Sequence, residues 1–84
     1  MKAAKKTIIQ IKERWNFVGV YHPATNTSPA HMTDASCIRL WGTTGGLGEL
    51  ALKGPTKETK LDFCSVVVFP NPEAVLFTIP CEWA

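Results

Sequence analysis

The stretch FCSVVVFPNPEAVLFTIPC, residues 63–81, is the part of the sequence that decides the fold we expect. It contains two apolar runs, 63–69 and 74–81, and their valine and aromatic residues are typical of strands. The prolines and asparagine of residues 70–73 favour a turn and keep either strand from extending into it. The sequence therefore predicts two antiparallel strands that pair as a hairpin.

The predicted hairpin is apolar on both faces. Successive strand residues point to opposite faces, and only Ser65 and Thr78 interrupt the apolar pattern. A hairpin with one face in water alternates apolar and polar residues, so we expect both faces to be covered. Burying about 500 Å² of such a face contributes on the order of 10 kcal/mol, comparable to the whole stability of a small domain. We therefore expect a homo-oligomer, most simply a symmetric dimer.

The remainder of the chain shows shorter patterns. Residues 7–21 have a two-residue period that favours a strand, but residues 4–15 also fit helical spacing, and both alternatives stay open. Residues 12–14 are interpreted as a bulge or a tight turn. Residues 22–36, rich in proline and small polar residues, predict a long loop, and residues 37–41 predict a second strand.

One short helix is expected over residues 47–53. Leu47, Leu50 and Ala51 lie at helical spacing, and Gly54 with Pro55 ends the pattern. Together these elements predict an α+β fold, a small, mostly antiparallel β-sheet of four to five strands with one short α-helix. The 84 residues predict a single domain, 1–84, in which residues 1–6 form a flexible basic arm.

Charge and cysteine content bear on partners and location. The net charge of +2 selects no partner, while the lysines of the arm leave nucleic-acid binding as a minor hypothesis. The cysteines are Cys37, Cys64 and Cys81, an odd number without C-x-x-C spacing, so we expect free thiols and a cytoplasmic location. No segment resembles a signal peptide or a membrane span, and we expect no membrane partner.

Motifs for cofactors, metals and catalysis are incomplete. Residues 46–51 fit the G-x-G-x-x-A pattern of dinucleotide sites, but the chain is too short for the sheet that surrounds a dinucleotide. His22 and His31 flank the predicted loop with Cys37 beyond, a spacing too wide for a structural zinc site and without a fourth ligand. We therefore expect no catalytic residue, no metal and no cofactor.

A ligand-binding surface is expected beside the long loop. Arg39 and Trp41 share one strand face, where an arginine can hold an anion or stack on the ring; the structural alternative is an Arg39 that pairs with Glu49. The glycine-rich turn that follows offers free amides at a helix N-terminus. The candidate ligand-binding residues are Tyr21, Arg39, Trp41, Thr43, Thr44 and Glu49.

Residues 38–44 (IRLWGTT), 46–51 (GLGELA) and 54–56 (GPT) resemble small uncharacterised bacterial proteins carried by integron gene cassettes and other mobile elements. The likeness covers residues 37–81 and implies a bacterial, cytoplasmic accessory protein, without implying an activity. Our leading hypothesis is a non-catalytic, oligomeric binding or adaptor module. The alternatives are a small-ligand enzyme whose site forms between subunits and a nucleic-acid-binding protein that uses the basic arm.

Overall fold

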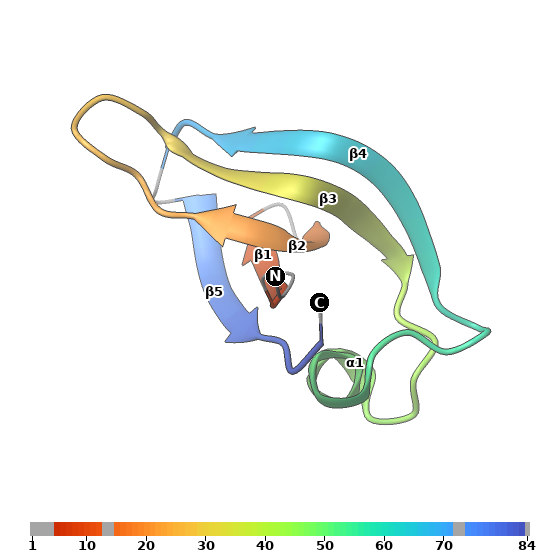
Figure 1. The fold of residues 1–84 in the computed structure, drawn as a ribbon. Coiled ribbons are helices and arrows are strands. Elements are labelled where there is room, and N and C mark those ends of the chain that lie inside the picture. Colours follow the sequence, from red (N-terminus) through yellow and green to blue (C-terminus); the bar gives the residue numbers. More distant parts are fainter. Residues whose placement is uncertain (1–4, 13–14, 72–73, 84) are drawn as a thin grey trace.

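A computed structural model describes residues 5–12, 15–71 and 74–83 of the chain. It shows a five-stranded antiparallel sheet with one short helix in this part of the chain (Figure 1). In chain order the elements are β1 (Thr7–Ile11), β2 (Asn16–His22), β3 (Ala30–Leu40), α1 (Gly46–Lys53), β4 (Lys60–Phe69) and β5 (Val75–Pro80). The prediction of a mostly antiparallel sheet with one short helix is confirmed in these terms, and strands dominate the fold.

The strands lie in the order β4-β3-β2-β1-β5, so β4 and β5 form opposite edges of the sheet (Figure 1). β5 pairs with β1, and β4 pairs with β3 along most of its length. The hairpin predicted for residues 63–81 is therefore wrong, although both of its strands exist. A proline-rich connection indicates where a strand ends, but not which strand it pairs with, because pairing depends on the rest of the sheet. Here β3 is the neighbour of β4, and β1 is the neighbour of β5.

Residues 7–11 form a strand, which settles the choice between strand and helix for that stretch. β1 and β2 pair antiparallel, with Thr7 opposite Gly19, and the Ile11 amide donates to the Trp15 carbonyl at 3.0 Å. The predicted strand over residues 7–21 is thus two strands, β1 and β2, which pair antiparallel with each other. Residues 13 and 14 of the expected bulge or turn lie outside the described residues.

The long loop predicted for residues 22–36 is wrong in its second half, because β3 already begins at Ala30. Ala30, Met32 and Ala35 are buried, but the pairing register shifts between Thr33 and Ala35, next to Asp34 with its φ of 51°. This bulge breaks the two-residue period that would have indicated a strand. The loop that remains covers residues 23–29.

Two hydrophobic clusters lie on opposite faces of the sheet, and β1 contributes to both. Ile8 and Ile9 are fully buried and, as successive strand residues, point to opposite faces. The buried residues of the first cluster are Ile8, Val18, Ile38, Leu50, Ala51 and Cys81. Those of the second cluster are Ile9, Ala30, Met32, Ala35 and Phe69. The fold therefore buries the centre of the sheet on both faces.

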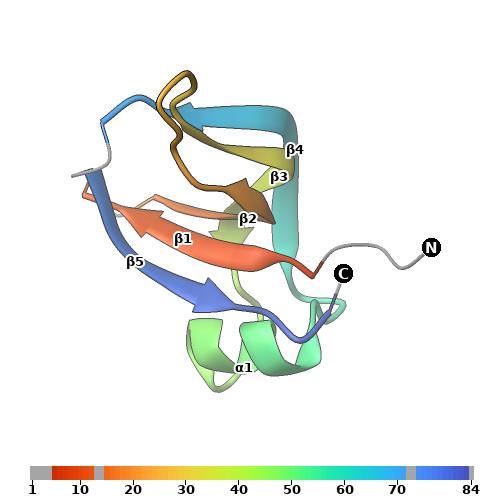
Figure 2. The same ribbon diagram turned by 60° about the vertical axis from the view of Figure 1, so that its left-hand side comes forward.

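α1 covers the face that carries the first cluster and lies next to β1 and β5 (Figure 2). The helix expected over residues 47–53 is confirmed and begins one residue earlier. Gly54 ends it with a φ of 86°, and the Trp83 indole donates to the Leu50 carbonyl at 2.7 Å. With eight residues, α1 is far shorter than a bilayer span requires, and the described part of the chain contains no longer helix.

The expectation that residues 63–81 are covered on both faces holds only in part. Phe69 is buried, and Val67 and Val75 pack against the second cluster. The large apolar side chains of β4 and β5 that remain exposed are Phe63, Val66, Val68, Leu76 and Phe77.

Candidate binding surface

The six predicted ligand-binding residues do not lie together. Tyr21 pairs with Met32 near one end of β3 and packs against Phe69, with ring centroids 6.3 Å apart. Arg39 lies at the opposite end of β3 and Glu49 in the first turn of α1, and the other three lie in the connection between these two elements. At about 3.3 Å per strand residue, roughly 20 Å separates Tyr21 from Arg39. The structure therefore places Tyr21 with the second cluster and apart from the other five.

Arg39 and Glu49 each have a local partner. The Arg39 Nε lies 3.1 Å from the Asp62 carboxylate on β4, so Arg39 has a cross-strand partner in place of the Glu49 named in the structural alternative. Both side chains of this pair are largely exposed, where ion pairs contribute little to stability. The Glu49 carboxylate accepts a hydrogen bond from the Gly45 amide at 3.1 Å. The Gly45 amide, which could have donated to a bound anion, therefore already has Glu49 as its acceptor.

The remaining residues of the set belong to the turn before α1. Thr43 is buried and its hydroxyl donates to the Gly46 carbonyl, which holds the start of the helix. Thr44 is exposed, as is Trp41, whose carbonyl accepts a hydrogen bond from the Thr59 hydroxyl at 2.7 Å. These contacts shape the turn and leave the Trp41 ring as its main exposed apolar group.

A second surface, which sequence reasoning missed, lies across β2, β3 and β4. The register puts His22, His31 and Val68 in one row across the three strands, and Val20, Thr33 and Val66 in the next. Cross-strand partners project from the same face, so both rows share one face. We call this the β2–β4 surface, defined by Val20, His22, His31, Thr33, Val66 and Val68.

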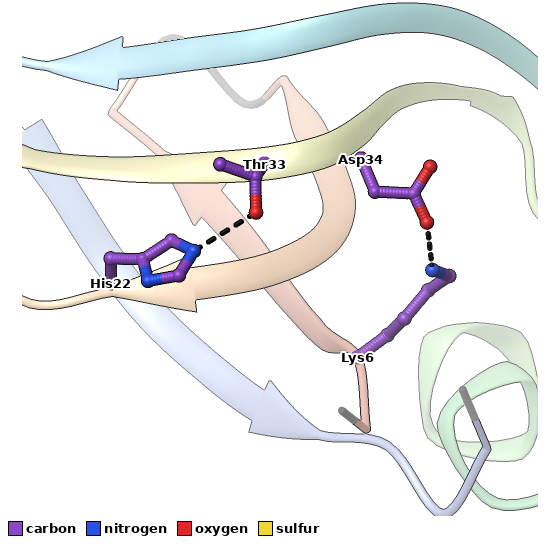
Figure 3. Close-up of polar contacts among 4 residues, drawn as sticks. All are labelled: Lys6, His22, Thr33 and Asp34. Atoms are coloured by element: carbon purple, nitrogen blue, oxygen red, sulfur yellow. Dashed lines mark hydrogen bonds and ion pairs between the residues drawn. The ribbon is translucent and has the colours of Figure 1, made fainter. Parts of the chain in front are cut away.

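The polar groups of the β2–β4 surface are tied to one another. The rings of His22 and His31 stack with centroids 4.6 Å apart. The His22 Nε2 lies 2.9 Å from the Thr33 hydroxyl (Figure 3). Beside them the Lys6 ammonium lies 2.7 Å from the Asp34 carboxylate (Figure 3). The Lys6 side chain is only 16% exposed, so this residue of the predicted flexible arm is held against the sheet.

The apolar edge of the β2–β4 surface is its most exposed part. Val66 is 53% exposed and Val68 is 51% exposed, and Phe63 further along β4 is 70% exposed. β4 lies along the outer border of the molecule in both ribbon views (Figures 1 and 2). Because β4 has a strand neighbour on one side only, alternate backbone amides and carbonyls point away from the sheet. This edge therefore offers apolar side chains and hydrogen-bonding backbone together.

The cysteines are poor candidates for a nucleophile. Burial, followed by the nearby Cys64 and Asp62, raises the pKa of Cys37, and burial raises the pKa of Cys81 to about 11. Both shifts disfavour the thiolate, which is the reactive form. The Cys64 thiol is exposed and donates to the Asp62 carbonyl at 3.3 Å. Within the described residues there is no group of three or more metal-binding side chains and no pocket.

Comparison of the chain with protein-family models, curated proteins and solved structures finds no match. The function of the chain is therefore inferred from its own residues. The sequence does contain one signal for the β2–β4 surface, the run of three valines at residues 66–68. A strand that buries only one face needs apolar residues at alternate positions, so a continuous apolar run indicates apolar side chains on its other face as well.

Proposed function

We propose that this protein is a non-catalytic binding module that works as a homo-oligomer and binds through the open edge of β4. One observation carries the proposal: a ten-residue edge strand presents Val66 and Val68, each more than half exposed, beside unpaired backbone groups. Natural edge strands are usually blunted by charges, proline or a bulge. In β4 the charged residues Lys60 and Asp62 and the register shift at Ser65 all precede Val66, and residues 66–69 contain neither a charge nor a proline.

The free energy available at this edge is of the size that association needs. Full burial of a valine side chain contributes about 1.5–3 kcal/mol, so contacts that cover the exposed halves of Val66 and Val68 in two copies contribute at most roughly 3–6 kcal/mol. Backbone hydrogen bonds along a joined edge add about 0.5–1.5 kcal/mol each. Association costs about 4–15 kcal/mol in lost freedom, so the terms nearly balance and binding should depend on protein concentration.

The other edge of the sheet is a weaker candidate. β5 has six residues, and its Pro80 has no amide hydrogen to donate. Leu76 on β5 is nevertheless 53% exposed, the same fraction as Val66. This equality makes Leu76 a matched control for Val66.

Nucleic-acid binding through the basic arm has less support than the β4 edge. In the described part of the arm, Lys6 pairs with Asp34 at 2.7 Å and Lys5 lies 3.6 Å from the Glu82 carboxylate. Ammonium groups that already have acidic partners are less available to phosphates. Residues 1–4 of the arm lie outside the described residues.

Sedimentation velocity over a range of concentrations tests the proposal. The unaltered protein should sediment as a concentration-dependent oligomer, Val66→Lys should remain a monomer, and Leu76→Lys should behave like the unaltered protein. A monomer at every concentration would refute the proposal. Oligomers that survive Val66→Lys but are lost in Leu76→Lys would also refute it, because the binding edge would then be β5.

A further inference from the structure

We infer that the partner at this edge is a second copy of the chain, whose β4 pairs antiparallel with β4 of the first copy about a two-fold axis at Val67. The inference rests on the proposed function and adds the symmetry and the register of the pairing. The two sheets would join into one continuous sheet of ten strands. A symmetric interface of this kind uses the same surface on both copies.

The side-chain pattern of β4 selects this register. In an antiparallel pair related by a two-fold axis, residues directly opposite each other lie on the same face. An axis at Val67 puts Val66 opposite Val68 of the second copy and Val67 opposite its own counterpart. A shift of the β4–β4 register by one residue would place Val66 opposite a residue whose side chain points to the other face, so such registers are excluded.

The ends of the apolar segment exclude the neighbouring symmetric registers. An axis at Val66 would draw in the irregular stretch at Cys64 and Ser65, where the pairing with β3 shifts register and Ser65 has a φ of 71°. An axis at Val68 would set Val66 opposite Pro70, which has no amide hydrogen to donate. The axis at Val67 limits the central pairing to Val66, Val67 and Val68, which form a regular segment without a proline.

The joined surface is also compatible in charge and shape. No charged side chain lies within residues 65–69, so no like charges meet across the axis. The row of His22, His31 and Val68 would continue into Val66 of the second copy. The four valines of the two copies would then form one apolar cluster, flanked on each side by His31 and Thr33. Lateral contacts within this cluster reduce the exposure of the four valines, and the polar rows remain at its border.

Disulfide cross-linking tests both the partner and the register. Val66→Cys and Val68→Cys are each made in a Cys64→Ser background, because the Cys64 thiol is exposed. The two variants are mixed in equal amounts and oxidised with diamide, which takes two electrons and two protons from each pair of thiols. Opposite residues have Cβ atoms about 4.5–5.5 Å apart and diagonal ones about 7–8 Å, so the 66–68 cross-link should exceed the 66–66 and 68–68 cross-links several-fold. Leu76→Cys in the same background is the control and should give little cross-link.

The outcomes separate this inference from the proposed function. An excess of the 66–68 cross-link, identified by mass spectrometry, supports the register. If the unaltered protein is an oligomer but the 66–68 cross-link does not exceed the others, the inference is wrong and the proposed function stands. If the unaltered protein is a monomer at all concentrations, both are wrong.

Discussion

Replacing Gly19 with alanine tests the packing that produces the β2–β4 surface. Gly19 lies in β2 opposite the bulge of the neighbouring strand β3. A Cβ added at Gly19 would lie 2.6 Å from the Met32 Cγ, 2.8 Å from the Thr33 carbonyl oxygen and 2.9 Å from the Ala35 Cα. Two of these three atoms belong to the backbone and cannot rotate away. Overpacking of this kind costs about 1–3 kcal/mol. For a domain of this size, about 2 kcal/mol lowers the melting temperature by roughly 8–16 °C.

The control is the same substitution at Gly48. Gly48 lies inside α1, and an added Cβ meets no atom within 4 Å. Alanine is favoured over glycine in a helix by about 0.5–1 kcal/mol, so Gly48→Ala should raise the melting temperature while Gly19→Ala lowers it. Urea unfolding followed by circular dichroism measures both changes. If Gly19→Ala changed the unfolding free energy by less than about 0.5 kcal/mol, the close approach of β2 to the bulge of β3 would be refuted.

Three further predictions concern stability. Trp83→Phe removes the indole hydrogen bond to the Leu50 carbonyl and should cost about 1 kcal/mol in thermal unfolding. Asp34→Asn removes the ion pair with Lys6; because the Asp34 side chain is 63% exposed, the loss should stay under about 1 kcal/mol and shrink in high salt. The pKa of Cys81 is raised to about 11 from its ordinary 9.0 because the neutral thiol is favoured by burial. Its contribution to stability should therefore be complete below pH 9 and be lost as the pH rises towards 11, a decline that Cys81→Ala should lack.

The sequence was most informative where one local signal dominates. The helix follows from Leu47, Leu50 and Ala51 at helical spacing and from the glycine and proline behind them, and no other part of the fold is needed to predict it. The two-residue period of residues 7–21 favoured a strand at β1, but the helical spacing of residues 4–15 left the choice open until the structure was known. The helix depends only on neighbours in sequence, and its pattern is complete.

Strand pairing was less accessible because it depends on partners that are distant in sequence. The run at 66–68 and the run at 75–77 predicted two strands correctly, but β3, β2 and β1 lie between them in the sheet. The bulge at Asp34 likewise hid most of β3, since a left-handed residue inside a strand is not evident from composition. The β2–β4 surface depends on both features, and it therefore became visible only once the register was known.

Hydrogen exchange at the β4 backbone tests the central claim most directly. Amides of residues 65–69 that point away from β3 should exchange rapidly in dilute solution and become protected as the protein concentration rises, because the second copy supplies their acceptors. Amides on the outer side of β5 should exchange at the same rate throughout. If the outward β4 amides exchanged equally fast at every concentration while the inner amides of the sheet stayed protected, the edge of β4 would be open to water and the account would be wrong.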